Sequence, residues 1–151
     1  MSQQKGNGDL PRRGARSKPL IGAVKPRICT PLLKGASRID EVAELADKIG
    51  MPLLPWQRFV LEDILKVDKD GMFVRKTSLL LVARQNGKTH LARMRILAGL
   101  FLFGEKNIVA MSSNRNMALD TFRQVANTIE DNPFLKAQVR QIRYANGQES
   151  I

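Results

Sequence analysis

The stretch SLLLVARQNGKTHLA, residues 78–92, constrains the fold of this chain more than any other. Its first half is uniformly apolar, as in strands buried on both faces, and its second half has the apolar spacing of an amphipathic helix. The turn between the two halves carries Gly87-Lys88-Thr89. A loop between a buried strand and a helix can hold phosphates, because its backbone N–H groups converge and the helix N-terminus adds positive potential.

Each residue of this turn offers a group that suits a nucleotide. Gly87 lets the backbone approach a phosphate, Lys88 places an ammonium near the β and γ phosphates, and Thr89 offers a hydroxyl to Mg²⁺. Val82 stands where the usual phosphate-loop pattern has its first glycine. The alternative is a turn that contains Gly-Lys-Thr by chance, but the strand-to-helix context favours the nucleotide site.

Two further features point to the same chemistry. Arg84 lies within the loop, where a guanidinium can stabilise the charge that develops on a γ-phosphate. Upstream, Trp56 and Gln57 combine a flat aromatic surface with a carboxamide, which together can stack and hydrogen-bond an adenine. The alternatives are a surface arginine paired with a carboxylate, and a tryptophan that anchors the helix it precedes.

The rest of the chain alternates predicted helices with predicted strands, which favours βαβ units and a parallel sheet. We therefore expect an α/β fold: part of a P-loop NTPase of three layers with a mainly parallel sheet. Such a domain needs more strands than this chain supplies, so the sequence reads as truncated. The predicted helices cover residues 37–49, 57–67, 88–103 and 114–131, the predicted strands cover 72–83 and 107–113, and a hairpin turn is predicted at 146–147.

Charge divides the chain into two regions. Residues 1–38 hold nine Lys and Arg against one acid, which is +8 of the net charge of +11, and the remaining sixteen bases and thirteen acids contribute +3. We expect residues 1–36 to form a disordered, basic, Pro- and Gly-rich arm, and residues 37–151 to form the folded domain. Such an arm can bind polyphosphates or merely keep the protein soluble.

Composition narrows the location. Hydrophobic residues make up 43% and charged residues 26%, which is typical of a soluble globular protein. No apolar segment is long enough to span a membrane, and the N-terminus lacks the apolar core of a secretory signal, so we expect a cytoplasmic protein. The single cysteine, Cys29, excludes a disulfide within the chain.

Three segments together resemble the ATPase domain of the large terminase subunit of tailed phages, the motor that packages DNA into procapsids. These are LLPWQRFVLEDIL, LLLVARQNGKTHLA and NIVAMSSNRNMALDTFRQV, and the resemblance covers about residues 50–151. In that family the first glycine of the loop is dispensable and an arginine stands early in the loop. Val82 and Arg84 match this departure from the usual pattern.

The resemblance implies a set of site residues, ligands and partners. It assigns adenine binding to Trp56 and Gln57, catalytic roles at the γ-phosphate to Arg84 and Lys88, and Mg²⁺ binding to Thr89. The partners that it implies are ATP, Mg²⁺, double-stranded DNA, a small terminase subunit and a portal, with a homo-oligomeric ring in a bacterial host cell and no membrane. The residues implied to bind the nucleotide are Trp56, Gln57, Arg84, Gln85, Asn86, Gly87, Lys88 and Thr89.

The sequence departs from this family at the catalytic acids. Hydrolysis requires a buried strand that ends in an acidic pair. The only adjacent Glu-Asp after the loop, Glu130-Asp131, ends a predicted helix, and the family's nuclease domain is absent. We therefore expect ATP binding with little hydrolysis. Two alternatives stay open: a DNA-binding or interaction module without enzymatic activity, whose phosphate loop is vestigial, and a fragment of a helicase-like NTPase.

Overall fold

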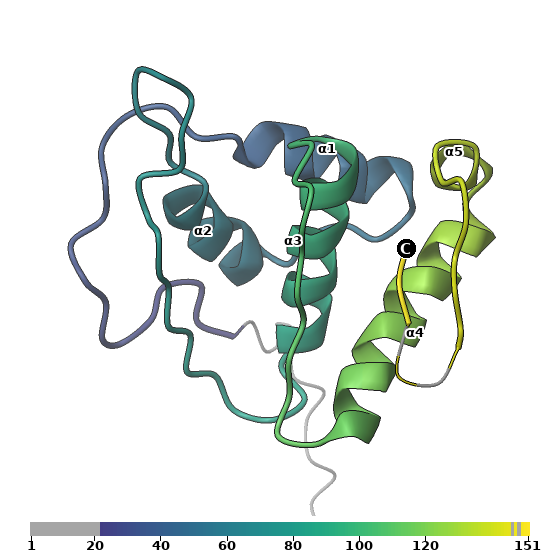
Figure 1. Ribbon diagram of the computed structural model, residues 1–151. Helices are drawn as coiled ribbons and strands as arrows, with labels where there is room; N and C mark the ends of the chain where they lie inside the picture. Colours follow the sequence, from purple (N-terminus) through teal and green to yellow (C-terminus); the bar gives the residue numbers. More distant parts are fainter. Residues whose placement is uncertain (1–21, 146, 148) are drawn as a thin grey trace, which may run out of the picture.

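Five helices make up the regular structure of the residues that the structure describes. The computed structural model describes residues 22–145, 147 and 149–151. In Figure 1, α2 lies on one side of α3, and α4 with α5 lies on the other. The helices are α1 (Ile39–Lys48), α2 (Pro55–Ile64), α3 (Lys88–Phe101), α4 (Arg115–Asp131) and α5 (Pro133–Lys136).

The expected α/β fold is wrong. Within the described ranges there is no β-strand, and the only strand-like pairings are three isolated antiparallel bridges, Ser37–Lys66, Val67–Phe73 and Arg143–Ser150. The segments predicted as strands, 72–83 and 107–113, contain no strand. The predicted hairpin turn falls partly on Asn146, which lies outside the described residues, and the last bridge closes around it. The chain is thus all-helical where a three-layer, mainly parallel sheet was expected.

The physical reason lies in what a strand needs. An apolar run can predict an extended backbone, but a strand also requires a neighbour that accepts and donates its backbone hydrogen bonds. No backbone–backbone hydrogen bond is found for the described residues 76–86 or 106–113. Leu79 and Leu81 are accordingly 84% and 86% exposed, and Val109 and Met111 are 78% and 88% exposed. These segments lack the neighbours that a sheet would have supplied.

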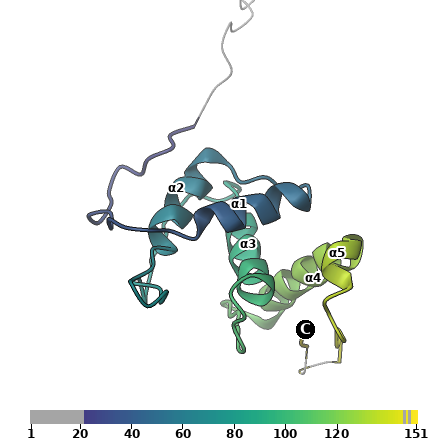
Figure 2. The same cartoon turned by 90° about the horizontal axis from the view of Figure 1, so that it is seen from above.

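The core consists of two clusters that share α1 and α3. In the first cluster α1, α3, α4 and α5 pack together, and in the second α1, α2 and α3 do so. Because α3 belongs to both clusters, it carries buried residues on more than one side: Leu97 faces the first and Leu91 the second. Figure 2 shows the same central position of α3 from above.

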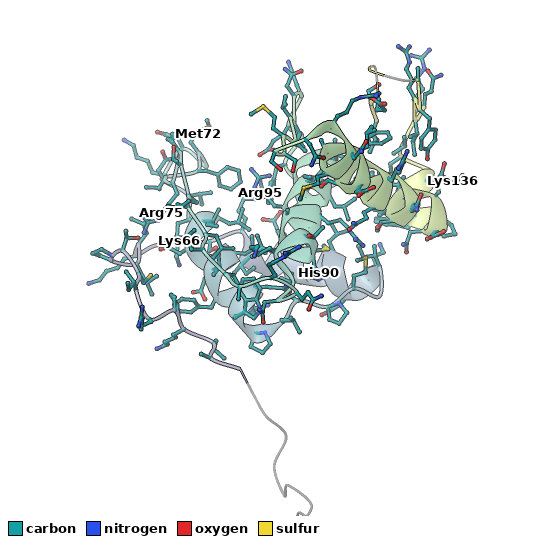
Figure 3. The ribbon with its side chains drawn as sticks, turned by 90° about the horizontal axis from the view of Figure 1, so that it is seen from below. Lys66, Met72, Arg75, His90, Arg95 and Lys136 are labelled. Atoms are coloured by element: carbon teal, nitrogen blue, oxygen red, sulfur yellow. The ribbon has the colours of Figure 1, made fainter. Side chains whose placement is uncertain are left out.

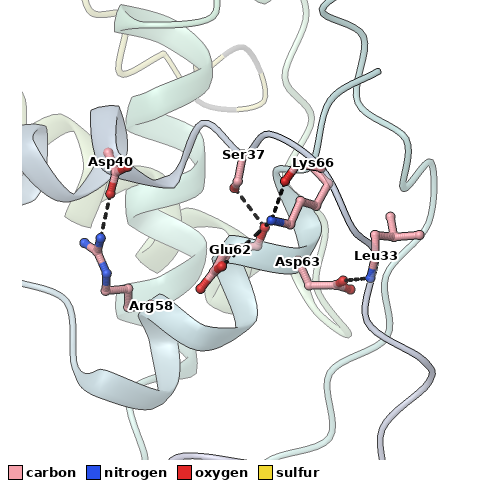
Figure 4. Close-up of polar contacts among 8 residues, drawn as sticks. Leu33, Ser37, Asp40, Arg58, Glu62, Asp63 and Lys66 are labelled. Carbon is pink, nitrogen blue, oxygen red and sulfur yellow. Dashed lines mark hydrogen bonds and ion pairs between the residues drawn. The ribbon is translucent and has the colours of Figure 1, made fainter. Parts of the chain in front are cut away.

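The segment before α1 is tied to α2 by polar contacts, which Figure 4 shows. The Asp63 carboxylate accepts from the Leu33 N–H at 2.7 Å and from Arg75 Nε at 2.6 Å. Burial raises the pKa of Asp63, but these two bonds outweigh it and hold the pKa below its ordinary value. Ser37, two residues before α1, donates its hydroxyl to the Glu62 carbonyl at 2.8 Å.

The segment after α3 turns back against that helix at Gly99. A Cβ added at Gly99 would lie 2.5 Å from Glu105 Oε2 and 2.6 Å from Ile108 Cδ1. Arg95 holds the Glu105 carboxylate with two hydrogen bonds, of 3.0 and 2.6 Å. In Figure 1 the segment runs down the length of α3 towards the start of α4. The small residue therefore permits a close approach that a larger side chain would block.

Candidate functional site

The predicted phosphate loop lies at the start of α3. Gly87 is the residue before the helix and has φ +84°, and Gln85 has φ +61°, both in the left-handed region. No side chain caps this end of α3. The N–H groups of its first turn therefore have no partner within the helix, and they point towards the loop together with the positive end of the helix dipole. This geometry suits an anion.

Gln57 joins the two predicted motifs. Its side chain is fully buried; Nε2 donates to the Gly87 carbonyl at 2.9 Å, and Oε1 accepts from the Leu54 N–H at 2.8 Å. The second bond satisfies an otherwise open N–H at the start of α2. The structure thus brings residues 54–57 against the loop across thirty positions of sequence, with the Gln57 amide acting as a brace between them.

The close packing explains the glycine in the loop. A Cβ at Gly87 would lie 2.8 Å from Gln57 Nε2, 3.6 Å from Leu54 Cδ1 and 3.8 Å from Trp56 Cζ2. The last distance places the indole edge beside the loop, while Trp56 also packs against the second core cluster. Both readings of Trp56, core anchor and neighbour of the loop, are therefore compatible with its position. The sequence reasoning missed Leu54, and no local sequence signal distinguishes it from any other leucine.

Lys88 is engaged with the loop itself. Its ammonium donates to the carbonyl oxygens of Val82 and Ala83, the latter at 3.0 Å. Val82, which stands in place of the usual first glycine, thus contributes a backbone oxygen to the loop. An ammonium held this way lies close to the loop backbone, where it can exchange a neutral carbonyl for an anionic phosphate oxygen and gain a stronger, charge-assisted hydrogen bond.

The remaining predicted site residues are at the surface. Arg84, Gln85, Asn86 and Thr89 are exposed. Asn86 Nδ2 donates to the Arg84 carbonyl at 2.9 Å, which closes the turn. Arg84 makes no ion pair with any described carboxylate. The surface arginine paired with a carboxylate, the alternative for this position, is therefore not seen.

Clustered side chains that could bind a metal ion are the next feature of the site. Among the residues that the structure describes, no group of three or more His, Cys, Asp and Glu could hold a metal ion. Glu130 ends α4 and accepts from the Tyr144 hydroxyl at 3.0 Å. Of the residues predicted to bind the nucleotide, Thr89 is the one assigned to Mg²⁺, and its hydroxyl suits a metal carried by the phosphates.

His90 follows the loop on the first turn of α3. Burial lowers its pKa, the positive charge of Arg93 lowers it further, and hydrogen bonds to the backbone of Pro52 and Met51 oppose the shift. The Nε2 atom of His90 and the Nε atom of Arg93 are buried without a hydrogen-bond partner. His90 is therefore held neutral behind the loop and does not add charge to the phosphate site.

Comparison with known proteins gives no relative. No protein-family model, no curated protein and no solved structure matches the chain. In the described ranges, no helix has both the length and the apolar character that crossing a bilayer requires.

Proposed function

We propose that this chain binds ATP through residues 84–89, with the phosphates at the N-terminus of α3. The observation that carries the proposal is the hydrogen bond from Gln57 to the Gly87 carbonyl, which brings two motifs suggested independently by the sequence into one place. The open first turn of α3 and the Lys88 ammonium supply the groups that recognise phosphate. The proposal uses a loop and a helix and requires no sheet.

We further propose that the chain is the ATP-binding portion of a phage terminase large subunit. The support is the resemblance of three segments within residues 50–151 to segments of that family, above all ARQNGKT at 83–89. In that role its partners are double-stranded DNA, a small terminase subunit and a portal, in a homo-oligomeric ring in the bacterial cytoplasm. Mg²⁺ would arrive with ATP and use the Thr89 hydroxyl.

Little hydrolysis is expected from this chain alone. Glu130 and Asp131, the adjacent acidic pair after the loop, lie at the C-terminal end of α4, so no carboxylate is assigned the activation of water. Arg84 and Lys88 would therefore act by binding and orienting the γ-phosphate. The two alternatives, an interaction module with a vestigial loop and a fragment of a helicase-like NTPase, differ in whether ATP binds.

The test uses Trp56, the single tryptophan, as a reporter beside the loop. We expect its fluorescence to change on addition of Mg²⁺-ATP, and Lys88→Ala to weaken ATP binding by roughly 10- to 100-fold, because a charge-assisted hydrogen bond contributes about 1.5–3 kcal/mol. Lys76→Ala, which removes an exposed lysine without an ion pair, is the control and should leave binding unchanged. An equal ATP response in Lys88→Ala and the control would contradict the site and favour the interaction module.

A further inference from the structure

A second set of cations, remote in sequence from the phosphate loop, lies on α5 and the segment that follows it. Lys136, Arg140 and Arg143 are all exposed, and no carboxylate of the described chain lies within 4 Å of them. Figure 3 shows Lys136 at the edge of the molecule. We call these three residues the basic stripe.

The stripe is held in place by an apolar face of the same segment. Leu135 is fully buried in the first core cluster, and Val139 and Ile142 pack against it. Each residue of the basic stripe directly follows one of these three apolar residues in the sequence. The bridge between Arg143 and Ser150, with backbone bonds of 2.8 and 3.2 Å, fixes the far end of the segment. The three cations are thus displayed from a backbone that is anchored along its length.

The stripe segment carries charge of one sign in the sequence. From residue 132 to residue 148 the sequence contains three basic residues and no acid. Within the described ranges seven ion pairs join Lys and Arg to carboxylates, and none of them involves a residue of the basic stripe. Leaving like charges close together has a cost that a bound polyanion would remove.

The surface beside the stripe is hollowed and carries amides. Arg140 and Arg143 line a cavity of about 460 Å³ together with Gln138 and Gln141, against Leu100 and Phe101 at the end of α3. Tyr144, 51% exposed, follows directly; its ring packs edge-on against Phe122 and its hydroxyl donates to Glu130 at 3.0 Å. Guanidinium, ammonium and amide groups are the side chains that contact phosphate and sugar, and an exposed aromatic ring suits a base.

We propose that the basic stripe is a binding surface for the phosphate backbone of a nucleic acid. The surface uses residues distinct from the loop at 84–89 and from the N-terminal arm, so it is independent of ATP binding. Three cations spaced along one anchored segment fit successive phosphates, and the contacts that they make are not specific for sequence.

The experiment compares two triple variants of the full chain that lose the same charge. In one, Lys136, Arg140 and Arg143 are replaced by Ala; in the other, the exposed and unpaired Lys69, Lys76 and Lys106 are replaced by Ala. Binding to short duplex DNA is followed by fluorescence anisotropy at several salt concentrations. We expect the stripe variant to bind more weakly and to lose roughly 2–3 units from the slope of log K against log salt, since each phosphate contact contributes about 0.9.

The outcomes separate the possible explanations. Equal losses in the two variants would mean that net charge alone acts, and would overturn the proposal, as would no loss in either. If the stripe variant lost more affinity for vesicles containing phosphatidylserine than for DNA, the surface would be assigned to a membrane instead, and the proposal would be overturned. Far-ultraviolet circular dichroism of both variants verifies the fold, and Arg140→Lys with Arg143→Lys, which keeps the charge, should retain most of the salt slope. Loss of ATP binding in Lys88→Ala with DNA binding intact would leave this proposal standing.

Discussion

At the scale of single residues, Gly87 is the position on which the candidate site depends most. Its φ of +84° disfavours any side chain, and a Cβ would lie 2.8 Å from Gln57 Nε2. Gly50 has a similar φ of +70° but no atom within 4 Å of an added Cβ. We expect Gly50→Ala to cost about 1–2 kcal/mol of unfolding free energy from backbone strain, and Gly87→Ala to cost roughly 1–3 kcal/mol more because of the contact.

The contact can be isolated by removing its partner. In a Gln57→Ala background the amide is gone, so Gly87→Ala should cost only the strain seen at Gly50. Urea unfolding of the parent, the two single variants and the double variant measures this coupling. An identical cost of Gly87→Ala in both backgrounds would mean that Gln57 does not brace the loop.

Part of this residue-scale picture could be read from the sequence. The loop at 84–89 and the pair Trp56-Gln57 were identified by the chemistry of their side chains, and Gln57 and Gly87 do lie in contact. The partners within the chain could not be predicted, because the Gln57 amide and the Lys88 ammonium bond to backbone carbonyls, and any residue type has one. The roles of these residues towards ATP remain predictions.

At the scale of elements, the segment 78–83 gives the sharpest test of the fold. Leu80 packs against the second core cluster, whereas its neighbours Leu79 and Leu81 are exposed. We expect Leu80→Ala to lower the unfolding free energy by about 1–2 kcal/mol, less than for a fully buried leucine, and Leu79→Ala and Leu81→Ala to stay within roughly 0.5 kcal/mol of the parent. The three single variants are matched in chemistry and differ only in position. Similar losses of unfolding free energy at all three positions would show that both faces of the segment 78–83 are buried in solution.

The helices and the strands differ in how far sequence could predict them. The predicted helices at 37–49, 88–103 and 114–131 correspond to α1, α3 and α4. Their hydrogen bonds are local, so a local pattern contains the information. The strands were wrong because pairing depends on distant segments, and the apolar pattern of 107–113 does not state which segment lies beside it.

At the scale of the whole molecule, unpaired positive charge is not confined to the N-terminal region where the sequence placed its surplus. The sequence placed the surplus of positive charge in residues 1–38, of which 1–21 lie outside the described ranges. The basic stripe contains three further unpaired cations that the total charge of residues 39–151 conceals. The sequence contained a local signal, since residues 132–148 contain no acid. Its importance depends on the packing of Leu135, Val139 and Ile142 in the core, which only the fold reveals.

The dependence of stability on pH should report on His90, the only histidine. Burial, together with the charge of Arg93, lowers its pKa below the ordinary value of 6.5 in the folded state. The unfolded chain therefore takes up a proton at a higher pH than the folded chain does. The contribution of His90 is fully present above pH 6.5 and is lost as pH falls from there through the folded pKa.

We therefore expect the urea midpoint of the full chain to fall as pH is lowered below 6.5, before the carboxylates respond. Glu41, whose hydrogen bond to Arg38 lowers its pKa, and Asp63 titrate below their ordinary values of 4.5 and 3.8, so their loss of stability comes at lower pH. His90→Gln cannot take up this proton and should flatten the curve in the window just below pH 6.5 while leaving the acid limb in place. A parallel decline in parent and variant across that window would show that His90 is solvated as freely in the folded chain as in the unfolded one.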